Sequence, residues 1–180
     1  MSETSPLPIL RATQLITQLQ LQPHPEGGWY REVFRSKALV QRSDARQLRP
    51  ALTSIYFLLE ADQYSRWHKV MSDEAWVYLE GLPLDLWSWD SSSGQVSHVQ
   101  LGPVKTMIDD SNPNATEAQC VIAAGLWQAA QPQAGPADSF TLVACMVGPG
   151  FDFSDFEMMR TDSHEAQQIA SIHPRLAHFI

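Results

Sequence analysis

His68 and Glu74 are two side chains whose types and spacing could do chemistry. They lie six residues apart, and Gly81 follows Glu74 by seven residues. An imidazole titrates close to neutral pH and is a common metal ligand, and a nearby carboxylate can orient it, share its proton or bind a metal beside it. The stretch 65–81 therefore indicates either proton transfer or metal ligation, with a buried hydrogen-bonded pair as the structural alternative.

Strands must position these two residues. The segments around them are rich in aromatic and β-branched residues, and Asp, Gly, Pro and Ser separate them at intervals of about ten residues, which is typical of an all-β sandwich or barrel. Besides the strands that carry His68 and Glu74, strands are predicted at 29–35, 54–59, 84–89, 97–101, 119–124, 126–129 and 140–147.

Two helices are expected outside the strands. Apolar residues at helical spacing predict an N-terminal helix from Ile9 to Leu21, which the turn 23–28 (PHPEGG) must end. Asp162, with Glu165 three residues later, predicts the cap of a short C-terminal helix over 166–172. Residues 38–50 are polar and rich in arginine and are expected to form a loop.

Several motifs occur in one order along the chain. They are P-H-P-E-G-G-W-Y-R-E at 23–32, T-S-I-Y-F-L-L at 53–59, W-H-K-V-M-S-D-E-A-W at 67–76, A-G-L-W-Q-A at 124–129 and P-G-F-D-F-S-D-F-E at 149–157. Over about residues 10–160 this order resembles the cupin superfamily, and within it the small uncharacterised cupins grouped as cupin family five. The resemblance implies a cupin jelly-roll β-sandwich or barrel, with the N-terminal and short C-terminal helices outside it, and usually a homodimer.

The resemblance also bears on a metal. Metal-binding cupins carry an H-x-H pair, a glutamate and a later histidine, and this chain has His68 and Glu74 at two of those positions. Val70 occupies the second imidazole position and Gln128 the last. Two good ligands and a neutral amide make a poor transition-metal site, so no metal or other cofactor is predicted. A divalent transition metal held by His68, Glu74 and Gln128 or His24 is the alternative.

Other residues are candidates to contact a ligand. His24 and Glu26 lie in a Gly/Pro turn, where they could equally cap backbone groups. Arg31 could clamp a carboxylate or phosphate or could form a surface ion pair. The aromatic candidates could line a cavity or belong to the core. The complete set of predicted ligand-binding residues is His24, Glu26, Tyr30, Arg31, Tyr56, Trp76, Trp127 and Gln128.

Composition limits the partners. The chain has 180 residues and a net charge of −8, with only three lysines, which argues against a nucleic-acid partner. One domain over residues 1–180 is expected, and the sequence shows no signal peptide and no stretch that could span a membrane, so a cytoplasmic location is predicted. Cys120 and Cys145 lie in apolar runs and are expected to be buried, reduced thiols.

Three functions follow from these observations. The preferred one is a metal-independent enzyme of the isomerase or epimerase type that binds a small molecule in the barrel. His68 would transfer the proton, Glu74 would set its tautomer and pKa, and Gln128 and Tyr56 would donate hydrogen bonds. The alternatives are a metal-dependent cupin enzyme and a non-catalytic binding or storage domain.

Overall fold

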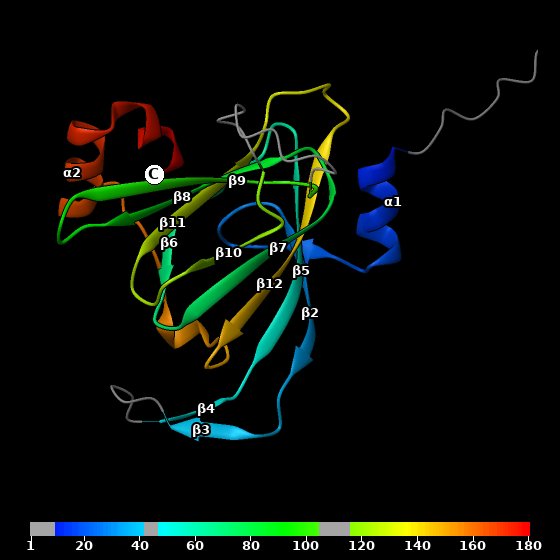
Figure 1. The fold of residues 1–180 in the computed structure, drawn as a ribbon, viewed down its shortest axis with the longest axis horizontal. Coiled ribbons are helices and arrows are strands. Elements are labelled where there is room, and N and C mark those ends of the chain that lie inside the picture. The colour runs from blue at the N-terminus through cyan, green and yellow to red at the C-terminus, as the bar shows by residue number, and fades with distance from the viewer. Residues whose placement is uncertain (1–9, 42–46, 105–115) are drawn as a thin grey trace, which may run out of the picture.

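Two antiparallel sheets face each other in the computed structural model, which describes residues 10–41, 47–104 and 116–180 (Figure 1). The six-stranded sheet has the order β1 (Gln22–Pro23), β2 (Trp29–Arg35), β5 (Thr53–Glu60), β12 (Phe140–Gly148), β7 (Asp73–Gly81), β10 (Gln119–Ile122). The five-stranded sheet has the order β13 (Phe156–Met158), β6 (Ser65–Val70), β11 (Trp127–Pro132), β8 (Leu84–Asp90), β9 (Gln95–Leu101). The all-β sandwich predicted from the spacing of strands and turns is confirmed.

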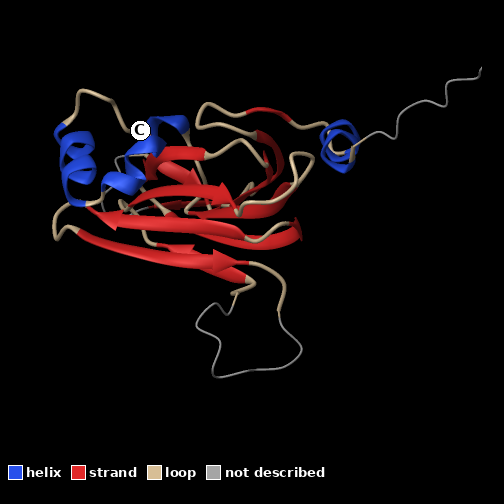
Figure 2. Cartoon of the chain, turned by 90° about the horizontal axis from the view of Figure 1, so that it is seen from above, coloured by secondary structure: helices blue, strands red, loops and turns tan. Residues whose placement is uncertain are grey.

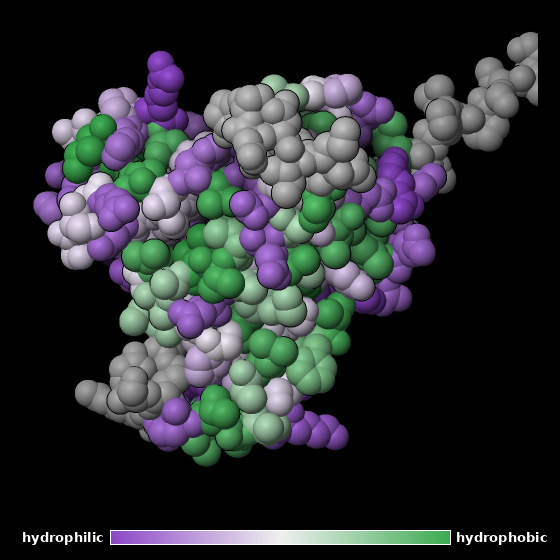
Figure 3. Space-filling view, in the orientation of Figure 1, coloured by the Kyte–Doolittle hydropathy of each residue, from purple (hydrophilic) through white to green (hydrophobic). Residues whose placement is uncertain are grey.

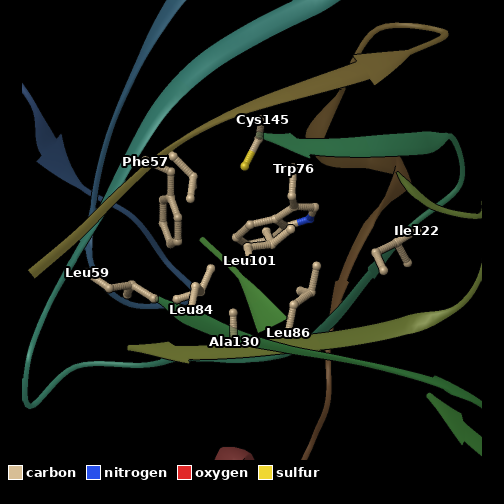
Figure 4. Close-up of a cluster of buried hydrophobic side chains, with 10 residues drawn as sticks. Phe57, Leu59, Trp76, Leu84, Leu86, Leu101, Ile122, Ala130 and Cys145 are labelled. Atoms are coloured by element: carbon tan, nitrogen blue, oxygen red, sulfur yellow. The ribbon is translucent and has the colours of Figure 1, made fainter. Parts of the chain in front are cut away.

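The main core lies between the two sheets. Phe57, Trp76 and Cys145 point into it from the six-stranded sheet, and Leu86 and Ala130 do so from the five-stranded sheet (Figure 4). Side chains two residues apart on a strand share a face, so each strand contributes alternate residues to this layer. The alternation of apolar residues in the sequence therefore determines which side chains can reach the interior.

Helices cover part of each outer face (Figure 2). Helix α1 (Arg11–Gln18) packs Ala12 and Leu15 against Leu58 and Leu142 of the six-stranded sheet. Helix α2 (His164–Ile172) and the 3₁₀ helix η2 (Pro174–Phe179) close a second cluster, rich in tryptophan, on the outer face of the five-stranded sheet. None of the helices described is long and apolar enough to cross a membrane.

Two local predictions were wrong. Residues 38–50 contain a small ribbon of β3 (Leu39–Gln41) and β4 (Leu48–Pro50), which projects from the body of the sandwich (Figure 1), while residues 42–46 of the predicted loop lie outside the described residues. Leu39 and Leu48 of the ribbon are exposed, and apolar side chains also appear elsewhere on the surface (Figure 3). The cap of α2 is Ser163, whose hydroxyl accepts from the Ala166 N–H, because Asp162 pairs with Arg160 instead.

Candidate functional site

A cavity of about 40 Å³ lies at the end of the sandwich where β6 turns into β7. The acid–base side chains that line it are His24, Glu26, His68 and Glu74. Thr53, Cys145 and several aliphatic and aromatic side chains complete the wall. A buried water needs about 10–15 Å³ of such space, so the cavity admits a group of only a few heavy atoms.

His68 points inward from β6 and is almost completely buried. Its Nδ1 lies 2.8 Å from the carbonyl oxygen of Arg66, and its Nε2 lies 3.2 Å from Oε2 of Glu26. A carbonyl can only accept, so Nδ1 carries a proton and Nε2 faces Glu26. The prediction that Glu74 sets the tautomer of His68 was wrong, because the Arg66 carbonyl does so. Burial lowers the pKa of His68, and the charge of Glu74 opposes that shift.

Glu26 reaches the cavity from the turn between β1 and β2. Gly28 has φ +68° and packs so closely on β5 that an added Cβ would lie 2.6 Å from the Leu58 carbonyl oxygen. This tight turn aims the Glu26 carboxyl into the barrel, where Ser65 Oγ donates to Oε1 at 3.0 Å. Burial raises the pKa of Glu26 to about 8, and the Ser65 hydrogen bond opposes the rise. Glu26 is therefore largely a neutral acid at pH 7, and one proton is shared between it and His68.

His24 stands beside Glu26 in the same turn. Its Nδ1 accepts weakly from the Glu26 backbone N–H at 3.4 Å, and the rings of Tyr30 and Phe156 surround it edge-on. Burial, and then the neighbouring His68, lower the pKa of His24 to about 3. His24 thus caps a backbone group and also lines the cavity, while its contact with a ligand stays a prediction.

Glu74 lies on β7 and contributes the second carboxyl of the cavity. Gln128 Nε2 donates to its Oε2 at 2.6 Å, and the Cys145 thiol also hydrogen-bonds to it. Burial raises the pKa of Glu74 to about 6, while the charge of His68 and these two hydrogen bonds oppose the rise. The two carboxyl groups therefore differ in charge between about pH 6 and pH 8.

The other predicted ligand contacts lie away from this cavity. Trp76 and Gln128 are buried behind Glu74, where the Trp76 Nε1–H donates to Gln128 Oε1. Arg31 and Tyr56 are register partners of β2 and β5, with the guanidinium 6.0 Å from the phenol ring centre, and Tyr56 packs in the α1 cluster. Trp127 belongs to the outer tryptophan cluster. The structure brings together only His24, Glu26, Tyr30, His68 and Glu74.

Cys145 is a cavity residue that was not among the sequence candidates. The sequence predicted that Cys120 and Cys145 are buried, reduced thiols. Neither forms a disulfide and Cys145 is buried, but Cys120 is only partly buried. The position of Cys145 beside Glu74 depends on the register between the neighbouring strands β12 and β7. In this register Cys145 is paired with Trp76, and Val147 is paired with Glu74. Burial raises the pKa of this thiol well above its ordinary value. Alternation along β12 would have placed Cys145 inside the barrel but not next to Glu74.

The residues at the metal-ligand positions of cupins do not fit a metal. Val70 offers no donor atom, and both ends of the Gln128 amide are occupied by Trp76 and Glu74. Within the residues that the structure describes, no group of three or more His, Cys, Asp or Glu side chains is placed to hold a metal ion.

A sandwich of two antiparallel sheets with an inward histidine and glutamate at this spacing defines a cupin. The chain belongs to the Cupin superfamily (DUF985) family, whose model matches residues 13–159. A protein of Shewanella oneidensis is similar in structure, with 29% identity, a TM-score of 0.74 and 94% of each chain covered. A hypothetical protein from Leishmania major has 31% identity and a TM-score of 0.73, with 93% of this chain and 94% of that chain covered.

More distant cupins share the fold alone. The oxalate decarboxylase of Lactobacillus farciminis has 13% identity and a TM-score of 0.51, and it matches 86% of this chain against 38% of its own. CapF of Staphylococcus aureus has 8% identity and a TM-score of 0.54, with 78% and 31% covered. Comparison with curated protein sequences gives no match.

Proposed function

We propose that this cupin binds a small molecule in its barrel and moves a proton on it without a metal, as an isomerase or epimerase does. The observation that carries the proposal is the buried set of His68, Glu26 and Glu74 around one cavity. When environments push the pKa values of two carboxyls apart, the lower one suits a base and the higher one an acid. Glu74, with a pKa of about 6, is then the base, and Glu26, with a pKa of about 8, is the acid.

The proposed step is proton abstraction next to a carbonyl group. The Glu74 carboxylate takes a proton from the carbon, and the electron pair of that C–H bond forms the C=C bond of an enol. The carbonyl oxygen gains the proton that Glu26 and His68 share. Protonated Glu74 then returns its proton to the neighbouring carbon, and a hydroxyl group of the enol gives its proton back to Glu26 and His68 as the new carbonyl forms, so both carboxyl groups return to their starting state.

The ligand group that enters is small and uncharged. No lysine or arginine is among the residues described as lining the cavity, so a carboxylate or phosphate there would meet ionised Glu74 without a balancing charge. The volume of about 40 Å³ admits the reacting carbonyl and its neighbours rather than a whole nucleotide. Short hydroxyaldehydes and hydroxyketones have this chemistry.

Deuterium exchange tests the proposal. Glycolaldehyde, glyceraldehyde and dihydroxyacetone are incubated with the protein in D₂O, and proton NMR follows loss of the signal next to the carbonyl. We expect exchange above the spontaneous rate that disappears in His68→Ala and Glu74→Gln. Tyr56→Phe, on the outer face, should keep it. Absence of catalysed exchange with every compound, or unchanged exchange in His68→Ala, would contradict the proposal.

A further inference from the structure

Three buried side chains form a hydrogen-bond chain that ends on the cavity. Trp76 Nε1 donates to Gln128 Oε1 at 3.0 Å, and Gln128 Nε2 donates to Glu74 Oε2 at 2.6 Å. The exposed fraction is 1% for Trp76 and 0% for Gln128, so water does not compete for these bonds. Figure 4 shows the Trp76 ring among the core side chains, with Cys145 on the neighbouring strand.

The chemistry of the indole fixes the direction of this chain. An indole N–H can only donate, so the amide must turn its oxygen toward Trp76 and its NH₂ group toward Glu74. A donor aimed at a carboxyl group stabilises the ionised form more than the neutral form, because charge-assisted hydrogen bonds are stronger. The short distance to Oε2 agrees with such a bond.

We propose that Gln128, oriented by Trp76, is the positioning residue that keeps Glu74 ionised inside the barrel. The proposal deepens the proposed function, since it explains how a buried carboxylate remains available as the base. It gives Gln128 a role different from ligand contact, because its amide bonds to Trp76 and Glu74 and Gln128 is not among the residues that line the cavity.

The other groups that face Glu74 cannot replace Gln128. Cys145, from β12, is a weak donor. His68, from β6, favours ionised Glu74 by its charge, yet its own pKa is lowered by burial. Glu26, from the turn after β1, disfavours a second negative charge. The Gln128 amide is the strong neutral donor among the described partners of Glu74.

Titration of the free protein tests this role without a ligand. Glutamate labelled with ¹³C at Cδ is followed by NMR from pH 4 to pH 9, and Glu74→Gln assigns the signal of Glu74. Gln128→Met removes the amide with little change of volume, and Trp76→Phe removes the indole N–H donor together with part of the ring. Trp89→Phe is the matched control, because it makes the same change of side chain in the tryptophan-rich cluster on the outer face of the five-stranded sheet. There Trp89 Nε1 is buried without a hydrogen-bond partner.

We expect Gln128→Met to raise the Glu74 midpoint by about one to two pH units, the value of one hydrogen bond to a charged group. Trp76→Phe should raise the midpoint too, since the amide is then free to rotate, and Trp89→Phe should leave it unchanged. An unchanged midpoint in either Gln128→Met or Trp76→Phe overturns the proposal. If Gln128→Met does not fold, Trp76→Phe and Trp89→Phe still decide it. Deuterium exchange can fail while this titration succeeds, so the two proposals are tested separately.

Discussion

Glu26 Oε2 lies 3.2 Å from Nε2 of His68, and the two side chains come from different parts of the fold, one from a glycine turn and one from a strand of the five-stranded sheet. Both are nearly excluded from water. A carboxyl group and an imidazole in this position hold one proton between them, so the protonation of Glu26 is coupled to folding.

Glu26→Gln should change how stability depends on pH. A carboxyl group with a pKa of about 8 when folded and 4.5 when unfolded contributes stability below pH 4.5 and loses it as the pH rises to about 8. Glutamine resembles the neutral acid and has no such loss. Measured by urea unfolding, the difference in free energy of unfolding between Glu26→Gln and the natural chain should grow with pH, by at most about 1.4 kcal/mol per pH unit.

Other cavity residues shape the same curve, and Glu26→Gln also removes a charge that raises the pKa of Glu74. Glu74, with a pKa raised to about 6, acts in the same direction as Glu26. His24, with a pKa lowered from 6.5 to about 3, adds stability above pH 6.5 that is lost on acidification. His68, whose pKa burial also lowers, acts in the same direction as His24, and all three residues are present in each protein. A stability difference that stays constant between pH 5 and pH 9 would contradict the shared proton.

Phe179→Ala should destabilise the protein strongly. The ring is fully buried and packs between Trp67, Trp87 and Tyr64. Removing a buried phenylalanine costs about 3–5 kcal/mol because it leaves a cavity as well as losing contacts. Phe34→Ala is the control, since Phe34 is 51% exposed on β2 and should cost less than about 1 kcal/mol. Equal losses in urea unfolding would show that η2 does not pack as described.

The natural chain should bind transition metals weakly. Gln128 is engaged at both ends and Val70 has no donor, so zinc or manganese added to the protein should be removed by a chelator without change in the thermal midpoint. Elemental analysis after mild purification should find far less than one metal per chain. One metal per chain that is lost in the double variant His68→Ala/Glu74→Ala would instead support the metal-dependent alternative.

Arg49→Lys should loosen the ribbon β3–β4. The Arg49 guanidinium donates to the Asp155 carboxylate from Nε at 2.9 Å and from Nη2 at 3.1 Å. Nη2 also donates to the Ser154 hydroxyl. A lysine cannot form this fork. Hydrogen exchange read by mass spectrometry should become faster at 48–50 and 153–155. Arg160→Lys, in an exposed pair with Asp162, should leave those segments unchanged. If exchange at these segments is unaltered in Arg49→Lys, the bonds from Arg49 to Ser154 and Asp155 do not hold the ribbon in place.

The strands and half of the site could be predicted because local patterns determine them. Residues 65–81 carry His68 and Glu74 on strands that turn back on each other, and the unusual turn at 23–28 identified His24 and Glu26. Local patterns could not predict toward which face of its sheet each of the side chains of Arg31, Tyr56 and Gln128 points. Alternation says that Tyr30 and Arg31 face opposite sides, but only pairing with β5 shows that Tyr30 is the inner one.

The hydrogen bonds that join Trp76, Gln128 and Glu74 could not be predicted from the sequence for a similar reason. Trp76 and Gln128 come from different sheets and lie 52 residues apart. Their contact requires the two sheets to pack at a particular offset, which no local pattern contains. Gln128 was therefore predicted as a ligand contact when the structure places it against a carboxyl group. The predicted homodimer and the cytoplasmic location stay predictions.

The glycine turn that carries His24 and Glu26 has a consequence for protein engineering. Gly27 and Gly28 both have positive φ, and a Cβ on either would collide with a backbone carbonyl, of Tyr64 and Leu58 respectively. A mutant library that randomised these two positions would consist mostly of misfolded clones. A library that varied Tyr30 and Phe156 would change the cavity wall while leaving this backbone intact, so new substrate preferences should be sought there.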